Sequence, residues 1–125
     1  MRHIALDQRQ LPGAARREVS RVCREVSAGP VCEESATLIT SEVVTNALVH
    51  GRGDVCLSVQ TGGQVVHVEV GDDEPRHPRV HGPEADDLAE GGRGMRIVDL
   101  LSSAWGVCDR VGGGKNVWFE VPVRP

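Results

Sequence analysis

A carboxylate and a carboxamide lie four residues apart in the segment 41–51. Glu42 and Asn46 are separated by about one helical turn, so on a helix both would project from the same face. Such a pair can position a water or a hydroxyl group, and its amide oxygen can contribute to a Mg²⁺ site. The same two residues also suit an ordinary solvated helix face. Taken alone, the pair leaves both interpretations open.

A second candidate is Asp72, which follows the alternating apolar residues Val66, Val68 and Val70. This period of two predicts a strand with one buried face. A carboxylate at the point where a buried strand emerges can point into a cleft and accept a hydrogen bond from an exocyclic amine. The alternative is an acidic turn that only ends the strand.

A third candidate is the glycine-rich segment 91–98, Gly-Gly-Arg-Gly-Met-Arg-Ile-Val. A turn that leads directly into a helix exposes unpaired backbone N–H groups beside the positive end of the helix dipole, which favours a phosphate. The segment lacks the Gly-Lys-Ser/Thr of a P-loop, and no buried strand leads into it as in a dinucleotide-binding fingerprint. A plain helix start explains it equally well.

The periodicity of the chain predicts the elements that must position these residues. It indicates an edge strand near 3–6, helices over 12–28, 33–50 and 95–101, and hairpins over 55–70 and 105–123, with a long loop over 72–92. We expect one domain over residues 1–125. The fold class is an α/β two-layer sandwich (α+β), with a mixed, mostly antiparallel sheet and helices on one face.

Composition narrows the function further. The chain has 125 residues and a formal net charge of −4, which disfavours an electrostatic nucleic-acid binder. No apolar run approaches the roughly 20 residues of a membrane span, and the first ten residues lack the apolar core of a signal peptide. The four cysteines contain no CxxC pair, so we expect them to be reduced. We therefore expect a cytoplasmic protein.

The order of these motifs resembles the GHKL ATPase superfamily, whose nucleotide-binding domain is the Bergerat fold. Glu-x-x-x-Asn on a helix is followed by Asp at a strand end, by Gly-x-Gly at a helix start and by a glycine-rich hairpin. The likeness extends from Glu18 to Val123, and it is strongest in segments 41–51 and 92–99. Within the superfamily, the chain resembles small stand-alone members, the bacterial anti-sigma-factor serine kinases and similar actinobacterial ATP-binding regulators.

The resemblance implies ATP and Mg²⁺ as ligands and a role for each matching residue. Glu42 matches the general base that acts on a serine hydroxyl of a partner protein. Asn46 matches the residue that ligates Mg²⁺ on the nucleotide phosphates, and Asp72 matches the carboxylate that hydrogen-bonds the adenine amino group. Four residues match the lid hinge and helix start, where backbone N–H groups of the family bind the phosphates: Gly92, Arg93, Gly94 and Met95. Asn116 stands where the family often has a threonine near the base.

The resemblance also implies partners, a sigma factor and an anti-anti-sigma antagonist, and it allows a homodimer. Direct contact with nucleic acid or membrane is not expected.

One motif departs from the family pattern. The usual Asp-x-Gly-x-Gly is replaced over 72–78 by Asp-Asp-Glu-Pro-Arg-His-Pro, without a glycine, although stand-alone relatives often have an Asp-x-x-Pro-x-x-Pro form. The lid that follows carries Glu84, Asp86, Asp87 and Glu90, which would repel a triphosphate unless they point outward. These features favour an alternative function, a non-catalytic module that sequesters a partner and binds nucleotide weakly or not at all.

Overall fold

The computed structural model describes residues 2–5, 11–78 and 92–123. The element order expected from the sequence is confirmed. Along the chain the elements are β1 (Arg2–Ala5), α1 (Gly13–Glu25), α2 (Pro30–His50), β2 (Cys56–Gly62), β3 (Val65–Asp72), α3 (Gly92–Leu101), β4 (Ala104–Asp109) and β5 (Lys115–Pro122).

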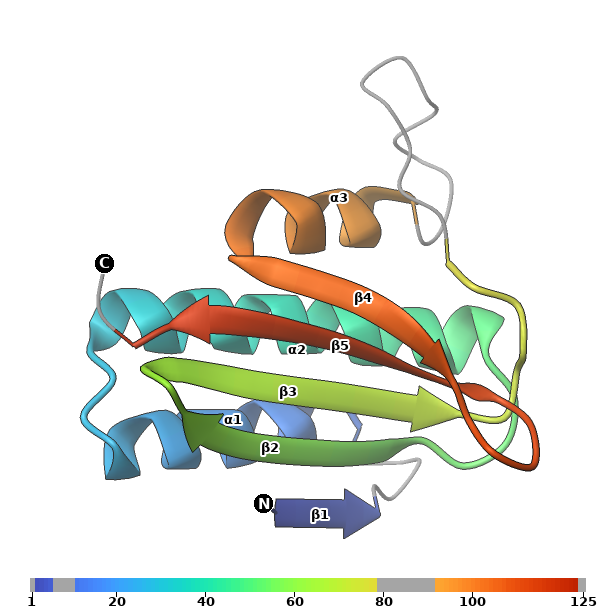
Figure 1. Ribbon diagram of the computed structural model, residues 1–125, viewed down its shortest axis with the longest axis horizontal. Coiled ribbons are helices and arrows are strands. Elements are labelled where there is room, and N and C mark those ends of the chain that lie inside the picture. The colour runs from blue at the N-terminus through green and yellow to red at the C-terminus, as the bar shows by residue number, and fades with distance from the viewer. Residues whose placement is uncertain (1, 6–10, 79–91, 124–125) are drawn as a thin grey trace.

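The five described strands form a single sheet in the order β1-β2-β3-β5-β4. Every neighbouring pair in it is antiparallel, so the parallel pairing implied by a mixed sheet is not present among the described strands. Helices α1 and α2 lie behind the sheet in Figure 1, and α3 packs beside α2. The two-layer α+β sandwich is therefore confirmed, with β1 as a short edge strand as predicted.

Alternation along the strands builds the core between the sheet and the helices. On β5, the side chains of Val117, Phe119 and Val121 are buried, whereas Trp118 and Glu120 between them are partly exposed. The helices contribute apolar faces, for example Ile39 and Val43 of α2. Burial of these aliphatic side chains and of the one phenylalanine stabilises the fold, at roughly 1.5–3 kcal/mol for each large side chain.

Two element boundaries differ from the expectation for local reasons. Helix α2 begins at Pro30 rather than near Glu33, because proline has no N–H to leave unpaired and its fixed φ suits the first helical turn. The residues Thr61-Gly62-Gly63 predict the β2–β3 turn, but it consists of Gly63 and Gln64, with φ of 59° and 67°, which fits a two-residue hairpin turn of type I′.

No helix in the described part of the chain is long and apolar enough to span a membrane.

Candidate functional site

A cavity of about 550 Å³ lies between the C-terminal half of α2 and the end of the sheet where β3 stops and β5 starts. Its lining residues come from α2, from β3 and β5, and from the segment after β3: Val43, Asn46, Ala47, His50, Gly51, Val70, Asp72, Glu74, Arg76, His77, Pro78, Lys115 and Val117. This volume is within the range of small-molecule sites, and apolar walls with a few polar groups are typical of them.

Asn46 brings an unsatisfied oxygen to this cavity. Its side-chain Oδ1 is buried and has no hydrogen-bond partner among the described residues. A buried polar atom without a partner costs about 1–3 kcal/mol, so such an atom in a cavity wall calls for a ligand. An amide oxygen is a ligand that Mg²⁺ accepts. Among the described residues, no group of three or more His, Cys, Asp or Glu side chains is arranged so that it could hold a metal ion, so phosphates and water would have to complete such a site.

Asp72 lies on the opposite wall, and its side chain is 2% exposed. Its Oδ1 accepts a hydrogen bond from the backbone N–H of Glu74 at 2.7 Å and a longer one from the N–H of Arg52 at 3.4 Å. Helix α2 ends directly against this carboxylate, because a Cβ on Gly51 would lie 2.8 Å from the Asp72 carboxyl carbon. The close contact holds Asp72 at one place in the wall.

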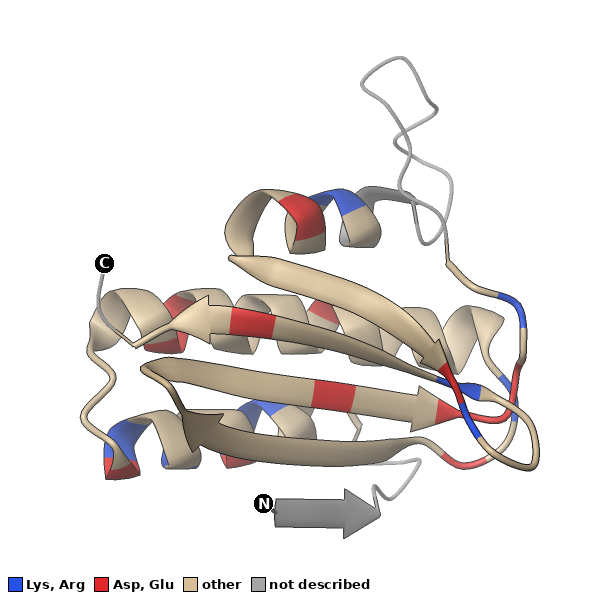
Figure 2. Ribbon diagram, in the orientation of Figure 1, with Lys and Arg blue, Asp and Glu red and all other residues tan. Residues whose placement is uncertain are grey.

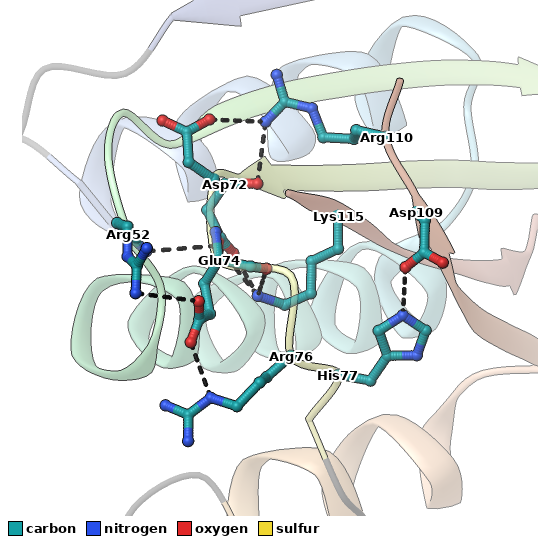
Figure 3. Close-up of polar contacts among 9 residues, drawn as sticks. Arg52, Asp72, Glu74, Arg76, His77, Asp109, Arg110 and Lys115 are labelled. Carbon is teal, nitrogen blue, oxygen red and sulfur yellow. Dashed lines mark hydrogen bonds and ion pairs between the residues drawn. The ribbon is translucent and has the colours of Figure 1, made fainter. Parts of the chain in front are cut away.

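Lys115, the only lysine of the chain, occupies the space beside Asp72. Its Nζ lies 3.0 Å from each Asp72 carboxylate oxygen and 2.9 Å from the carbonyl oxygen of Glu74 (Figure 3). Lys115 was not among the site residues predicted from the sequence, although the sequence carries a signal for it. Lys115 is in phase with the buried residues Val117 and Phe119, and a charge on the buried face of a strand needs a partner.

Ion pairs help to hold the glycine-free segment after Asp72. Glu74 is buried, with its carboxylate 2.8 Å from Nε of Arg76 and 3.6 Å from Nη2 of Arg52. The hydrogen bond from Arg76 lowers the pKa of Glu74; burial opposes this, and the charges of Arg52, Arg76 and Lys115 add to the lowering. Further along the same segment, His77 pairs with Asp109 of β4, with its Nε2 2.7 Å from Oδ1 of Asp109.

Arg110 attaches the same segment to the β4–β5 hairpin. Its guanidinium donates to the carbonyl oxygen of Asp72 at 3.0 Å and lies 3.5 Å from the carboxylate of Asp73. Figure 2 shows charged residues of both signs gathered at this end of the sheet. The cavity mouth is therefore lined by compensated charges.

The structure brings together two of the predicted site residues, Asn46 and Asp72, in one cavity. Glu42 is partly buried on α2, one turn before Asn46, and is not among the residues that line the cavity. Asn116 is not among them either. It alternates with Lys115 along β5, so its side chain points to the opposite face of the sheet, where it contacts Gly71.

The predicted phosphate-binding residues, Gly92, Arg93, Gly94 and Met95, form the first turn of α3. The Met95 side chain is 1% exposed and belongs to the core, so only its backbone could face a ligand. The acidic lid residues Glu84, Asp86, Asp87 and Glu90 lie outside the described residues.

An antiparallel sheet backed by helices, with a cavity between the second helix and the sheet that presents an asparagine oxygen and a buried aspartate, defines a GHKL-type ATPase domain. The family model for the histidine kinase-like ATPase domain matches residues 4–121, and the chain belongs to this family.

Two of the solved structures that match the chain are histidine kinase domains. One is the histidine kinase domain of a blue-light-activated kinase from Erythrobacter litoralis EL346, with a TM-score of 0.52 and 24% identity over 89% of this chain and 60% of that chain. Another is the histidine kinase domain of the E. coli osmosensor EnvZ, with a TM-score of 0.46 and 23% identity over 72% of this chain and 65% of that chain. This chain thus spans less than two thirds of either. No curated protein sequence matches it.

Proposed function

We propose that the chain is an ATP- and Mg²⁺-binding regulatory protein, an anti-sigma factor with serine kinase activity toward an anti-anti-sigma antagonist. Membership of the histidine kinase-like ATPase family supports nucleotide binding and phosphoryl transfer. The observation that carries the proposal is the buried Asn46 oxygen, which has no partner in the described part of the chain and lies in the wall of a cavity of about 550 Å³. The sigma factor, the antagonist and a cytoplasmic location are parts of the same proposal.

Asn46 would hold Mg²⁺, and the ion would neutralise charge on the nucleotide phosphates. Asp72, on the wall opposite Asn46, would accept a hydrogen bond from the adenine amino group. Backbone N–H groups at the start of α3 would meet the phosphates. Glu42, one turn from Asn46 and partly buried, would orient and deprotonate the serine hydroxyl of the antagonist.

The binding test is isothermal titration calorimetry with ATP, with and without Mg²⁺. We expect the wild type to bind ATP in a Mg²⁺-dependent way. In Asn46→Ala we expect the affinity for ATP to fall by at least about tenfold, because loss of a residue that only hydrogen-bonds to a metal ligand already has an effect of this size. Thr45→Ala is the matched control, because Thr45 is next to Asn46 on α2 but is exposed. The affinity of this variant for ATP should equal that of the wild type. Absence of ATP binding by the wild type would refute the proposal.

The kinase step is tested by transfer of labelled γ-phosphate to purified candidate antagonist proteins. Glu42→Gln removes the base but keeps the side-chain shape, so we expect ATP affinity to be retained while the transfer rate falls by about 10²-fold or more. Equal transfer by Glu42→Gln and wild type would exclude Glu42 as the base.

A second function has support of its own. Asp72 is already paired with Lys115, and Glu42 does not line the cavity. Both observations suit a module that sequesters a partner without catalysis. This function predicts that the Glu42→Gln variant silences the partner as well as the wild type does.

A further inference from the structure

The buried ion pair between Lys115 and Asp72 leaves the lysine no free hydrogen for a ligand. An ammonium group has three donors, and here the two Asp72 oxygens and the Glu74 carbonyl oxygen lie 2.9–3.0 Å from Nζ. The Lys115 side chain is 7% exposed. In this arrangement Lys115 has no hydrogen bond left to donate to a ligand, and it holds the Asp72 carboxylate that has an acceptor site free.

Asp72, by contrast, has acceptor capacity to spare. Its Oδ1 receives hydrogen bonds from two backbone N–H groups and from Lys115, whereas Oδ2 receives one from Lys115 alone among the described residues. Each carboxylate oxygen has two acceptor sites, so Oδ2 keeps one for a ligand. An ionised carboxylate accepts hydrogen bonds but cannot donate one, whereas a protonated carboxyl group has an O–H donor.

We propose that Lys115 is the positioning residue that makes this cavity select purines with an amino group at position 6 over purines with an oxo group there. The inference rests on the proposed nucleotide binding. The ammonium holds both Asp72 oxygens in place, so that Oδ2 presents its remaining acceptor site to the base. The amino group of adenine donates to this site, whereas the oxo group of hypoxanthine or guanine is itself an acceptor and cannot.

Removal of the ammonium should weaken this selection. Lys115→Met keeps much of the side-chain length but leaves Asp72 buried without its counter-charge, which is strongly unfavourable. Without the ammonium, Oδ2 loses the only hydrogen bond it receives among the described residues, and water can enter beside the carboxylate. Such a water can donate a hydrogen bond to a 6-oxo group, so the rejected purine becomes acceptable.

The test compares the dissociation constants of ATP and ITP, measured by calorimetry in the presence of Mg²⁺. These two nucleotides have the same sugar and phosphates and differ at position 6 of the base and in the hydrogen that N1 carries in the 6-oxo form. We expect the wild type to prefer ATP by about 10- to 100-fold, as one well-formed base contact would give. In Lys115→Met we expect this preference to fall by about tenfold. An unchanged preference in a folded Lys115→Met protein would overturn the inference.

Two further variants separate positioning from general loss of structure. Asp72→Asn also lowers the preference, and adding Lys115→Met to it should cause no further change, because Lys115 acts only through Asp72. If Lys115→Met alone does not fold, this double variant, which lacks the unpaired charge, is compared with Asp72→Asn. A further drop in the double variant would contradict the inference.

Val121→Ala is the stability control, since Val121 is buried on the same strand and does not line the cavity. It should lower the unfolding temperature and leave the ATP preference at the wild-type value. If the wild type binds neither nucleotide, the proposed function fails and this inference fails with it. If it binds ATP but Lys115→Met keeps the preference, only the inference fails.

Discussion

His67 of β3 lies between two carboxylates on the sheet face opposite the core. Its Nδ1 is 2.8 Å from Glu120 and its Nε2 is 2.8 Å from Glu69, and its ring stacks on Trp118 with centroids 5.6 Å apart. Burial lowers the pKa of His67, but its hydrogen bonds to the Glu120 and Glu69 carboxylates outweigh it, so the pKa is raised from its ordinary value. The two carboxylates therefore favour the charged form of the imidazole.

This geometry predicts a pH dependence of stability. Because the folded pKa of His67 exceeds the unfolded value, its contribution is complete below about pH 6.5 and is lost as the pH rises through the folded pKa. We expect His67→Gln to lower the free energy of unfolding at pH 6, by less than about 1 kcal/mol since the glutamates are partly exposed, and by less at pH 8.5. Urea unfolding at both pH values measures it. A deficit that grows with pH would contradict the assignment.

The four free cysteines divide into two pairs by exposure: Cys23 and Cys32 are buried, and Cys56 and Cys108 are exposed. Burial, and then the neighbouring Cys32 thiol, raises the pKa of Cys23 to about 12. Since the thiolate is the reactive form, we expect two thiols per native chain to react rapidly with Ellman's reagent and the other two only on unfolding. Cys56→Ser should remove one rapid thiol. Rapid reaction of all four in the native state would disprove this division.

At the scale of elements, the β4–β5 turn controls the position of Asp72. Gly114 has φ of 86°, and a Cβ there would overlap the carbonyl oxygen of Asp72 and lie 2.8 Å from Cα of Asp73. Gly112, in the same turn, has φ of 88° but open space around its Cβ position. The two glycines therefore share the backbone strain of a substitution and differ only in the steric overlap.

We expect Gly112→Ala to lower the free energy of unfolding by about 1–2 kcal/mol, the cost of a left-handed conformation for alanine. Gly114→Ala should cost at least about 1 kcal/mol more, because backbone must shift, and it should weaken ATP binding by displacing Asp72. Chemical denaturation and calorimetry of both variants measure these effects. Equal losses for the two variants would show that the close contact has no energetic weight.

Most of the elements could be predicted, because each depends on a local pattern. The apolar period of three to four residues indicated the helices, and the alternation of Val66, Val68 and Val70 indicated β3. The pairing of β3 with β5 could not be predicted in this way, since it joins strands separated by a helix and another strand. The turn was expected at Thr61-Gly62-Gly63 and lies slightly later, at Gly63–Gln64; its second residue could not be predicted because glutamine at positive φ is uncommon.

At the scale of the whole molecule, a single core joins the sheet to the helices, with Phe119 fully buried as its largest side chain. We expect Phe119→Ala to lower the free energy of unfolding by about 3–5 kcal/mol. Trp118→Ala, one residue away on the opposite and partly exposed face, should cost less. Both losses can be measured from urea unfolding curves. A larger loss for Trp118→Ala would mean that the open face, not the core, dominates stability.

The sequence by itself determined the order of the elements, the Asn46 and Asp72 candidates and the family resemblance, because periodicity and motif order are properties of neighbouring residues. Only the tertiary structure decided that Lys115, 43 residues from Asp72, is its partner, and that Asn116 points away from the cavity. Both follow from the register that places Asp72 opposite Lys115 between β3 and β5. A register shifted by one residue would reverse the faces, and local pattern does not encode which distant strand supplies the counter-charge that a buried carboxylate requires.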